Sequence, residues 1–272
     1  MRTVSTASCV RALLASALLL GIASRPAQAE LQKKDVTYDY EGTPMKGYLV
    51  WDDSIQGKRP GVLVVHEWWG LNDYARSRAE QLAKLGYVAF AVDMFGEGKV
   101  TEHPTQAQEW SGTVRSNKQK WRERGIAGLE VLKKQPQVDP DQLAAIGYCF
   151  GGTTVLQMAY AGAPLKGVVS FHGGLMPPDA DVSVKPRVLI CTGGNDSFIP
   201  AEQINQFAFG MEAAKANYTI MVFGGARHGF TNPDAARYGI DNIAYDKAAD
   251  EQSWANMKLF FNELFPNHPA RD

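Results

Sequence analysis

The 272-residue chain has few cysteines and almost no net charge. It contains three cysteines, and no two of them have the Cys-x-x-Cys spacing of a thiol redox protein. Its 28 lysines and arginines are interspersed with 29 aspartates and glutamates, so no basic stretch would attract nucleic acid or anionic lipid. We therefore expect neither of these partners and no thiol redox function.

Long hydrophobic runs are also missing, with one exception near the start of the chain. Residues 12–23 (ALLASALLLGIA) are apolar, follow two arginines and precede the small-x-small sequence AQA at 27–29. This run is shorter than the about 20 apolar residues of a membrane-spanning helix. The pattern predicts a signal peptide over residues 1–29, cleaved after Ala29, and delivery to the periplasm or outside the cell. An uncleaved anchor is the alternative.

Residues 30–272 have the composition of an ordinary globular protein. The chain is 45% hydrophobic and 21% charged, and no repeat, low-complexity segment or linker divides this part. Its length suits one large α/β domain. We expect a single domain and a monomer, with no membrane association once the signal peptide is removed.

Short apolar runs alternate with amphipathic stretches after residue 36. Two alternating segments, 36–40 and 48–50, flank the turn-like sequence EGTP and predict an antiparallel hairpin. The later runs suit strands buried on both faces, and they lie at 62–65, 88–92, 143–147, 168–171, 188–191 and 219–223. Helical stretches lie between them, at 73–85, 105–134, 153–160, 202–215 and 244–265. This order predicts an α/β fold, with a mostly parallel twisted sheet, helices on both faces and an N-terminal hairpin.

A cysteine occupies a glycine-rich turn between a predicted strand and a predicted helix. The sequence GYCFGG at 147–152 has the form of the nucleophile elbow G-x-S-x-G, with Cys149 in place of serine. In this turn the sulfur would lie at a helix N-terminus, where the helix dipole favours a thiolate. The Phe150 N–H could there donate to an oxyanion. Taken alone, the motif is equally compatible with a buried structural cysteine.

An acid and a base follow two later strands. Asp196 comes after the strand at 188–191, and His228 lies in the glycine-rich loop after the strand at 219–223. Nucleophile, acid and base then appear in the chain order of α/β-hydrolases, at the strand ends where functional groups gather. The sequence therefore predicts a Cys149–His228–Asp196 triad that forms a thioester on an acyl carbon, which water then cleaves. We expect no cofactor and no metal ion to be needed.

Cys191 lies inside a predicted strand, two strands from the elbow in the expected sheet. Neighbouring strands are about 4.8 Å apart, so its Cα would lie roughly 10 Å from that of Cys149, beyond the ~7 Å reach of a disulfide. We expect a small core residue and no disulfide bond.

These motifs resemble the dienelactone hydrolase (carboxymethylenebutenolidase-like) family of α/β-hydrolases. The similarity covers most of the chain after residue 30, including VVHEWWG at 64–70, AVDMF at 91–95, the cysteine elbow, GND at 194–196 and HGF at 228–230. The resemblance implies that Glu67 pairs with the resting Cys149 thiol and that the N–H of Trp68 is a second oxyanion donor beside Phe150. It also implies a hydrolase of a small ester or lactone. A solvated loop carboxylate is the alternative for Glu67.

The resemblance does not extend to the substrate. Family members that act on dienelactone hold its carboxylate with two arginines, whereas the matching segments FGEGK at 95–99 and FTNP at 230–233 contain none. Lys99 and Arg237 are the nearest cations, but neither offers a bidentate fork at the expected place.

Aromatic residues near the motifs predict an aromatic-lined substrate pocket. We expect it to include Trp68, Trp69, Phe150 and Phe230. His172, at another strand end, is a candidate substrate contact, with a packed histidine as the alternative.

Two other functions stay open from the sequence alone. One is a broad-specificity carboxylesterase or thioesterase with the same triad. The other is a non-catalytic exported binding protein that has kept the fold. The complete triad favours an enzyme, because a binding protein has no need of an aligned acid and base.

Overall fold

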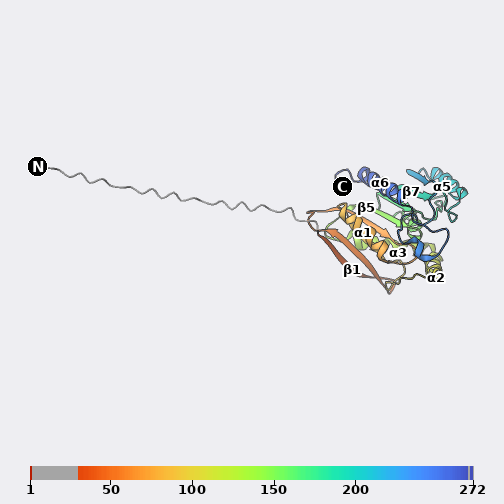
Figure 1. Cartoon of the computed structure of the whole chain (residues 1–272), viewed down its shortest axis with the longest axis horizontal. Helices are drawn as coiled ribbons and strands as arrows, with labels where there is room; N and C mark the ends of the chain where they lie inside the picture. The colour runs from red at the N-terminus through yellow and green to blue at the C-terminus, as the bar shows by residue number, and fades with distance from the viewer. Residues whose placement is uncertain (2–29, 269, 272) are drawn as a thin grey trace.

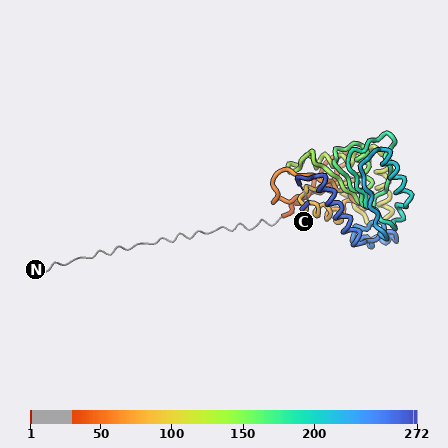
Figure 2. The backbone as a smooth tube through the Cα atoms, turned by 90° about the horizontal axis from the view of Figure 1, so that it is seen from above, coloured from red at the N-terminus to blue at the C-terminus, as the bar shows by residue number. Residues whose placement is uncertain are grey.

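A computed structural model describes residue 1, residues 30–268 and residues 270–271. The predicted signal peptide, apart from Met1, and its cleavage site after Ala29 therefore lie outside the described residues. Figures 1 and 2 both place the C-terminus beside the start of the first strand. There the Arg271 guanidinium lies 3.5 Å from the Asp52 carboxylate, in the strand that pairs with this first one.

The described residues form one eight-stranded sheet in the order β1-β2-β4-β3-β5-β6-β7-β8 (Figure 1). The first two strands make the predicted hairpin, β2 is antiparallel to β4, and all later neighbours are parallel. The strands are β1 (Leu31–Tyr40), β2 (Thr43–Asp52), β3 (Arg59–Val65), β4 (Val88–Val92), β5 (Val138–Tyr148), β6 (Gly167–Phe171), β7 (Arg187–Gly193) and β8 (Tyr218–Phe223). The prediction of a mostly parallel sheet with an antiparallel start is confirmed.

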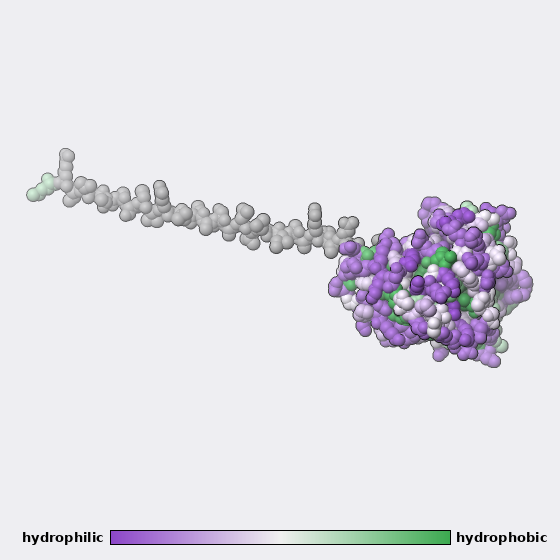
Figure 3. All heavy atoms as spheres, turned by 90° about the horizontal axis from the view of Figure 1, so that it is seen from below, coloured by the Kyte–Doolittle hydropathy of each residue, from purple (hydrophilic) through white to green (hydrophobic). Residues whose placement is uncertain are grey.

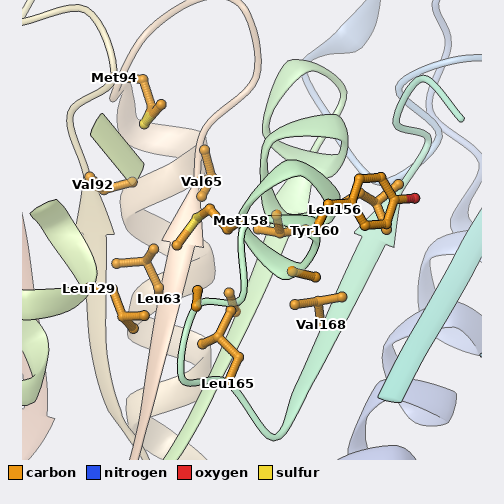
Figure 4. Packing of buried hydrophobic residues seen from close by; sticks show 14 of the residues in the cluster. Leu63, Val65, Val92, Met94, Leu129, Leu156, Met158, Tyr160, Leu165 and Val168 are labelled. Atoms are coloured by element: carbon orange, nitrogen blue, oxygen red, sulfur yellow. The ribbon is translucent and has the colours of Figure 1, made fainter. Parts of the chain in front are cut away.

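Helices cover both faces of this sheet because its central strands are apolar on both. Along β3, Val62 and Val64 pack into one core, whereas Leu63 and Val65 pack into the other. The first core includes α1 (Asp73–Lys84) and α6 (Lys247–Leu264). The second, part of which Figure 4 shows, includes α3 (Lys118–Lys133), α4 (Phe150–Tyr160) and α5 (Ala201–Ala213). Because the central strands are packed on both faces, the loops at their carboxyl ends start from fixed positions.

The helix predicted over residues 105–134 is wrong, because the structure has two helices there. These are α2 (Pro104–Arg115) and α3, and the chain leaves helical geometry at Asn117, whose side chain accepts a hydrogen bond from the Lys120 N–H at 3.1 Å. Asparagine competes with the helical backbone in this way and favours a helix start. The break separates α2 from α3.

Strand β8 differs from the expectation that it is buried on both faces. It is the last strand of the sheet and pairs with β7, and Val222 remains 53% exposed. The face drawn in Figure 3 is mostly polar, with small apolar areas between. Of the helices in the described part of the chain, none combines the length and apolarity needed to cross a membrane.

Candidate active site

The predicted nucleophile elbow is present between β5 and α4. Cys149 has φ 53° and ψ −115°, a strained conformation for a residue with a side chain. The surrounding sheet holds it there: its N–H donates to the Phe171 carbonyl at 3.0 Å, and its own carbonyl accepts from the Thr153 N–H. The turn therefore places the cysteine at the start of α4.

The glycines around Cys149 are required by close backbone contacts. A Cβ on Gly147 would lie 2.1 Å from the Gly151 carbonyl oxygen, and one on Gly151 would lie 2.1 Å from the Val65 carbonyl oxygen. Both contacts involve backbone atoms, one in α4 and one in β3, which cannot move aside without shifting that helix or strand. The elbow thus depends on glycine at both positions.

His228 and Asp196 come together at the ends of β8 and β7. The His228 Nδ1 lies 2.8 Å from Asp196 Oδ2, and the two residues are 7% and 4% exposed. An Nδ1–H that donates to the carboxylate leaves Nε2 free for the Cys149 thiol, which lines the same cavity as His228. The structure therefore brings the three predicted triad residues to one site.

The pKa of His228 is strongly raised. Burial alone would lower it, but the adjacent Cys149 and the hydrogen bonds to Asp196 and Cys149 outweigh burial and raise the pKa to about 10. A raised pKa of this kind favours the protonated imidazolium form of His228. The Asp196 carboxylate is itself fixed, because its Oδ1 accepts a hydrogen bond from the Phe198 N–H at 2.9 Å.

Two aromatic rings contact the His228 ring from its sides. His172 and Phe198 each lie 5.1 Å from it between ring centroids, both edge to face. His172 is fully buried, and its Nε2 lies 2.8 Å from the Thr231 hydroxyl. Burial, and then the neighbouring His228, lower the pKa of His172 well below its ordinary value. His172 is thus a neutral packing residue.

Glu67 follows β3 and is buried beside the triad. The Asn232 Nδ2 donates to its Oε2 at 2.7 Å, so its carboxylate has a hydrogen-bond partner other than the Cys149 thiol that the resemblance implies. Burial raises the pKa of Glu67 to about 7, against the effects of Asn232, His228 and Arg78. Asn232 was not among the predicted site residues, although an amide donor in the FTNP segment, where the family has an arginine, was a usable signal.

The two residues expected to supply oxyanion donors lie at the same cavity as Cys149. Trp68 and Phe150 line one cavity with Cys149, and the Phe150 N–H opens α4, where helical N–H groups lack an intrahelical acceptor. His66 fixes the loop that carries Trp68: its Nδ1 contacts the Glu67 carbonyl and its Nε2 accepts from the Met94 N–H at 3.1 Å. His66 therefore has the structural role of holding this loop.

A cavity of about 410 Å³ opens over Cys149 and His228. Its apolar wall contains Phe198, Ile199 and Ile243. Its polar wall comes from α2, with Gln108, Ser111 and Arg115. These α2 residues were not predicted, because α2 carries no motif and its sequence pattern continues into that of α3.

The structure differs from the prediction for three pocket residues. Trp69, Phe230 and His172 are at most 1% exposed and do not line the cavity over Cys149. Trp69 stacks on Tyr238 at 3.8 Å, and Phe230 packs against His172. These three residues lie in or near the motifs in the sequence. Their side chains are buried, however, and pack beneath the loops instead of facing the cavity.

The two cations nearest the motifs are engaged elsewhere. Lys99 pairs with Glu97 at 2.8 Å and Arg237 pairs with Glu102. Arg237 belongs to a second cavity of about 580 Å³, which Asn232 also lines but Cys149 does not.

Cys149 and Cys191 are both free thiols. Cys191 is fully buried in β7, with β6 between it and β5, and burial raises the pKa of its thiol. Within residues 30–268, no group of three or more histidine, cysteine, aspartate or glutamate side chains is placed to hold a metal ion.

Comparison with known proteins identifies this arrangement. The dienelactone hydrolase family profile matches residues 45–265. A Synechocystis protein provisionally named a carboxymethylenebutenolidase is 30% identical, over 84% of this chain and 96% of its own.

Solved structures named as dienelactone hydrolases or as dienelactone hydrolase-like are also similar to this chain. A dienelactone hydrolase-like promiscuous phosphotriesterase from metagenomic libraries is 38% identical, with a TM-score of 0.84, over 88% of this chain and 100% of its own. A dienelactone hydrolase from Anabaena variabilis, 19% identical over 84% of this chain and 97% of its own, shares the fold with a TM-score of 0.60. The chain therefore belongs to the dienelactone hydrolase family, a family of ester hydrolases with the α/β-hydrolase fold.

Proposed function

We propose that this protein hydrolyses a small ester or lactone through a Cys149–His228–Asp196 triad. The observation that carries the proposal is the arrangement of the triad: Cys149 at the elbow and His228 line the same cavity, and Asp196 holds the Nδ1 of His228 at 2.8 Å. A binding protein of the same fold would gain nothing from a strained cysteine aligned with a buried acid and base.

The first half of the reaction acylates the enzyme. The thiolate of Cys149 attacks the acyl carbon, and the carbonyl oxygen becomes an oxyanion within reach of the Trp68 and Phe150 N–H groups. One such donor contributes about 3 kcal/mol to transition-state stabilisation. When the intermediate collapses, the alkoxide leaves with the proton from His228 Nε2, and a thioester remains on the sulfur.

The second half releases the acid. Water attacks the thioester as neutral His228 takes one of its protons, and a second tetrahedral intermediate forms in the same oxyanion site. Its collapse breaks the carbon–sulfur bond and returns the Cys149 thiolate beside the His228 imidazolium. Asp196 remains charged throughout and keeps the ring in the orientation that both halves need.

The cavity supports a small substrate. A volume of about 410 Å³ lies at the small end of the range for ligand pockets, and its apolar wall suits an acyl or alkyl group. A broad-specificity carboxylesterase or thioesterase would use the same chemistry. The names of the relatives add dienelactones and phosphotriesters to the substrates to be tested.

We also propose that the protein is exported. The apolar run at 12–23 and the AQA sequence at 27–29 support a signal peptide cleaved after Ala29. Cell fractionation, with N-terminal sequencing of the recovered protein, tests this directly. An intact N-terminus or a cytoplasmic product would contradict it.

The function is tested by assaying residues 30–272 against p-nitrophenyl esters, lactones, dienelactones, thioesters and a phosphotriester. We expect turnover of at least one carboxylic ester or lactone, with a Cys149 acyl adduct in mass spectra of the quenched reaction. Cys149→Ala should abolish this turnover. Turnover that survives in Cys149→Ala would show that another group is the nucleophile.

A further inference from the structure

Three polar residues of α2 lie together in the wall of the cavity over Cys149. Gln108, Ser111 and Arg115 are spaced three and four residues apart, so they share one face of the helix. The Ser111 hydroxyl donates to the Gln108 carbonyl at 3.3 Å, and Arg115 Nη2 donates to Ser111 Oγ at 3.2 Å. Arg115 Nε also donates to the Ser111 carbonyl at 3.2 Å. The guanidinium is therefore held against the preceding turn of α2, at the cavity.

The charge of Arg115 has no counter-ion among the described residues. Its side-chain hydrogen bonds go to Ser111, and none of the described carboxylates forms an ion pair with it. A guanidinium has five N–H donors, and only two are used here. Apart from His228, Arg115 is the only ionised side chain among the described residues that line this cavity, and no aspartate or glutamate lines it. The cavity therefore favours a negatively charged group of a ligand.

The alcohol part of an ester would bind beside His228, because this residue protonates the departing oxygen. The His228 ring contacts the Phe198 ring at 5.1 Å between centroids, and its backbone forms a β-bridge with Ile243. Both neighbours line the cavity and carry no charge. The leaving-group side of the site is thus apolar.

The acyl part would extend toward α2. On this helix, the Trp110 ring lies 5.8 Å from that of Phe95, which in turn lies 5.7 Å from the ring of Phe150. Because the Phe150 N–H is an expected oxyanion donor, α2 packs on the oxyanion side of the elbow. At a tetrahedral acyl carbon, the sulfur, the oxyanion and the leaving oxygen take three directions. The acyl chain takes the fourth, away from His228 and toward the wall that contains Arg115.

We propose that Arg115 is a specificity-determining residue, which binds a carboxylate on the acyl part of the substrate. The substrate class is then a half-ester of a dicarboxylic acid with an uncharged, apolar alcohol. Cys149 displaces this alcohol, which leaves with the proton from His228, and water then releases the dicarboxylate from the thioester. This inference rests on the proposed function, because it concerns the same site. It differs from the family's carboxylate site, whose two arginines are absent from segments 95–99 and 230–233.

The inference is tested with three benzyl esters that differ in where they carry a charge. Monobenzyl glutarate carries it on the acyl part, and benzyl 5-methylhexanoate replaces that carboxylate with an isopropyl group of similar shape. The 4-carboxybenzyl ester of 5-methylhexanoic acid carries it on the alcohol. We expect the wild type to hydrolyse the glutarate with the highest kcat/KM of the three. Its ratio to the kcat/KM of the neutral ester measures the preference for an anionic acyl part.

Substitution of Arg115 should remove this preference. Arg115→Met should lower the ratio about tenfold, mainly by raising KM for the glutarate, because it removes a hydrogen bond to a charged group. Arg115→Lys should restore part of the ratio, since lysine keeps the charge but lacks the planar fork. Arg237→Met is the matched control, because Arg237 is also exposed but pairs with Glu102 and lines the second cavity, so the ratio should not change. Circular dichroism verifies that each variant is folded.

Two outcomes overturn the inference. In one, the wild type hydrolyses either of the other esters as well as the glutarate. In the other, Arg115→Met keeps the wild-type ratio, or Arg237→Met lowers it equally. If none of the esters is hydrolysed, the proposed function fails instead, and the binding of monobenzyl glutarate to Cys149→Ala, measured by calorimetry, decides the inference. Adding Arg115→Met should then weaken binding about tenfold, and an unchanged affinity would overturn it.

Discussion

Glu67→Gln should stabilise the protein at neutral and alkaline pH. Glu67 is 4% exposed, and its pKa is raised from 4.5 to about 7, mainly by burial. The unfolded chain therefore loses this proton at a lower pH than the folded chain does. A raised pKa of this kind gives stability that is complete below pH 4.5 and is lost as the pH rises through about 7.

The size of the effect follows from the shift. The difference between 4.5 and about 7, at 1.36 kcal/mol for each pKa unit, corresponds to about 3 kcal/mol of free energy of unfolding. The glutamine side chain in Glu67→Gln keeps a carbonyl oxygen that can accept the Asn232 hydrogen bond, and it never ionises. The two proteins should thus be of similar stability near pH 4.5, and the variant should gain by up to about 3 kcal/mol above pH 7.

The assay is urea denaturation of residues 30–272, wild type and Glu67→Gln, at half-unit steps from pH 4.5 to 8.5. Subtracting the two curves removes the titration of His228 and of other groups common to both proteins. Glu109→Gln, on the exposed face of α2, is the control and should give a flat difference. A difference for Glu67→Gln that does not vary with pH would refute the reasoning, because burial of a charge would then not be its cause.

Four further outcomes are expected. Cys149→Ala and His228→Ala should each lower kcat at least a thousandfold, measured on the best ester of the panel, and Asp196→Asn should lower it less. A smaller loss of kcat in Cys149→Ala would argue against the triad. Cys149→Ala should also lower the pKa of His228 from about 10 toward its ordinary value in an NMR titration, because Cys149 is the main group that raises it, and an unchanged pKa would contradict this interaction. Gly151→Ala should fail to form a native elbow, as judged by the yield of folded protein and by activity, since its Cβ meets the Val65 carbonyl at 2.1 Å; Gly112→Ala, with open space around it, should fold normally. Asp250→Ala should destabilise by about 3 kcal/mol in urea, because it leaves the buried Arg78 guanidinium unpaired, whereas Glu251→Ala on the surface should cost under about 1 kcal/mol.

Much of the fold could be predicted because the local patterns agree with the tertiary structure. The all-apolar runs of β3 and β4 form strands buried on both faces, and α1 begins at Asp73, where the predicted helix begins. The break between α2 and α3 could not be placed, since Asn117 is also compatible with a helix interior. The exposure of β8 depends on its position at the sheet edge, which its apolar composition does not report.

The candidate site was predictable where function requires an unusual local sequence. The elbow needs glycine around Cys149, so the motif identifies the turn as well as the nucleophile. The FTNP segment signals that Asn232 belongs to the site, but its pairing with Glu67 was not predictable, because the two residues are 165 positions apart in the chain and only the folded loop joins them. Aromatic residues are ambiguous for the same reason: Trp68 lines the cavity, whereas the adjacent Trp69 stacks on Tyr238 behind it.

The different surroundings of the two thiols have a practical consequence. Cys191 lies wholly inside β7, whereas Cys149 opens onto the cavity. In a preparation of residues 30–272, which lacks Cys9, a mild electrophile should consume one equivalent of reagent for each functional molecule. Such a titration would count active enzyme before any substrate is known. It would also let a covalent probe with a reporter group pull this protein from a cell extract.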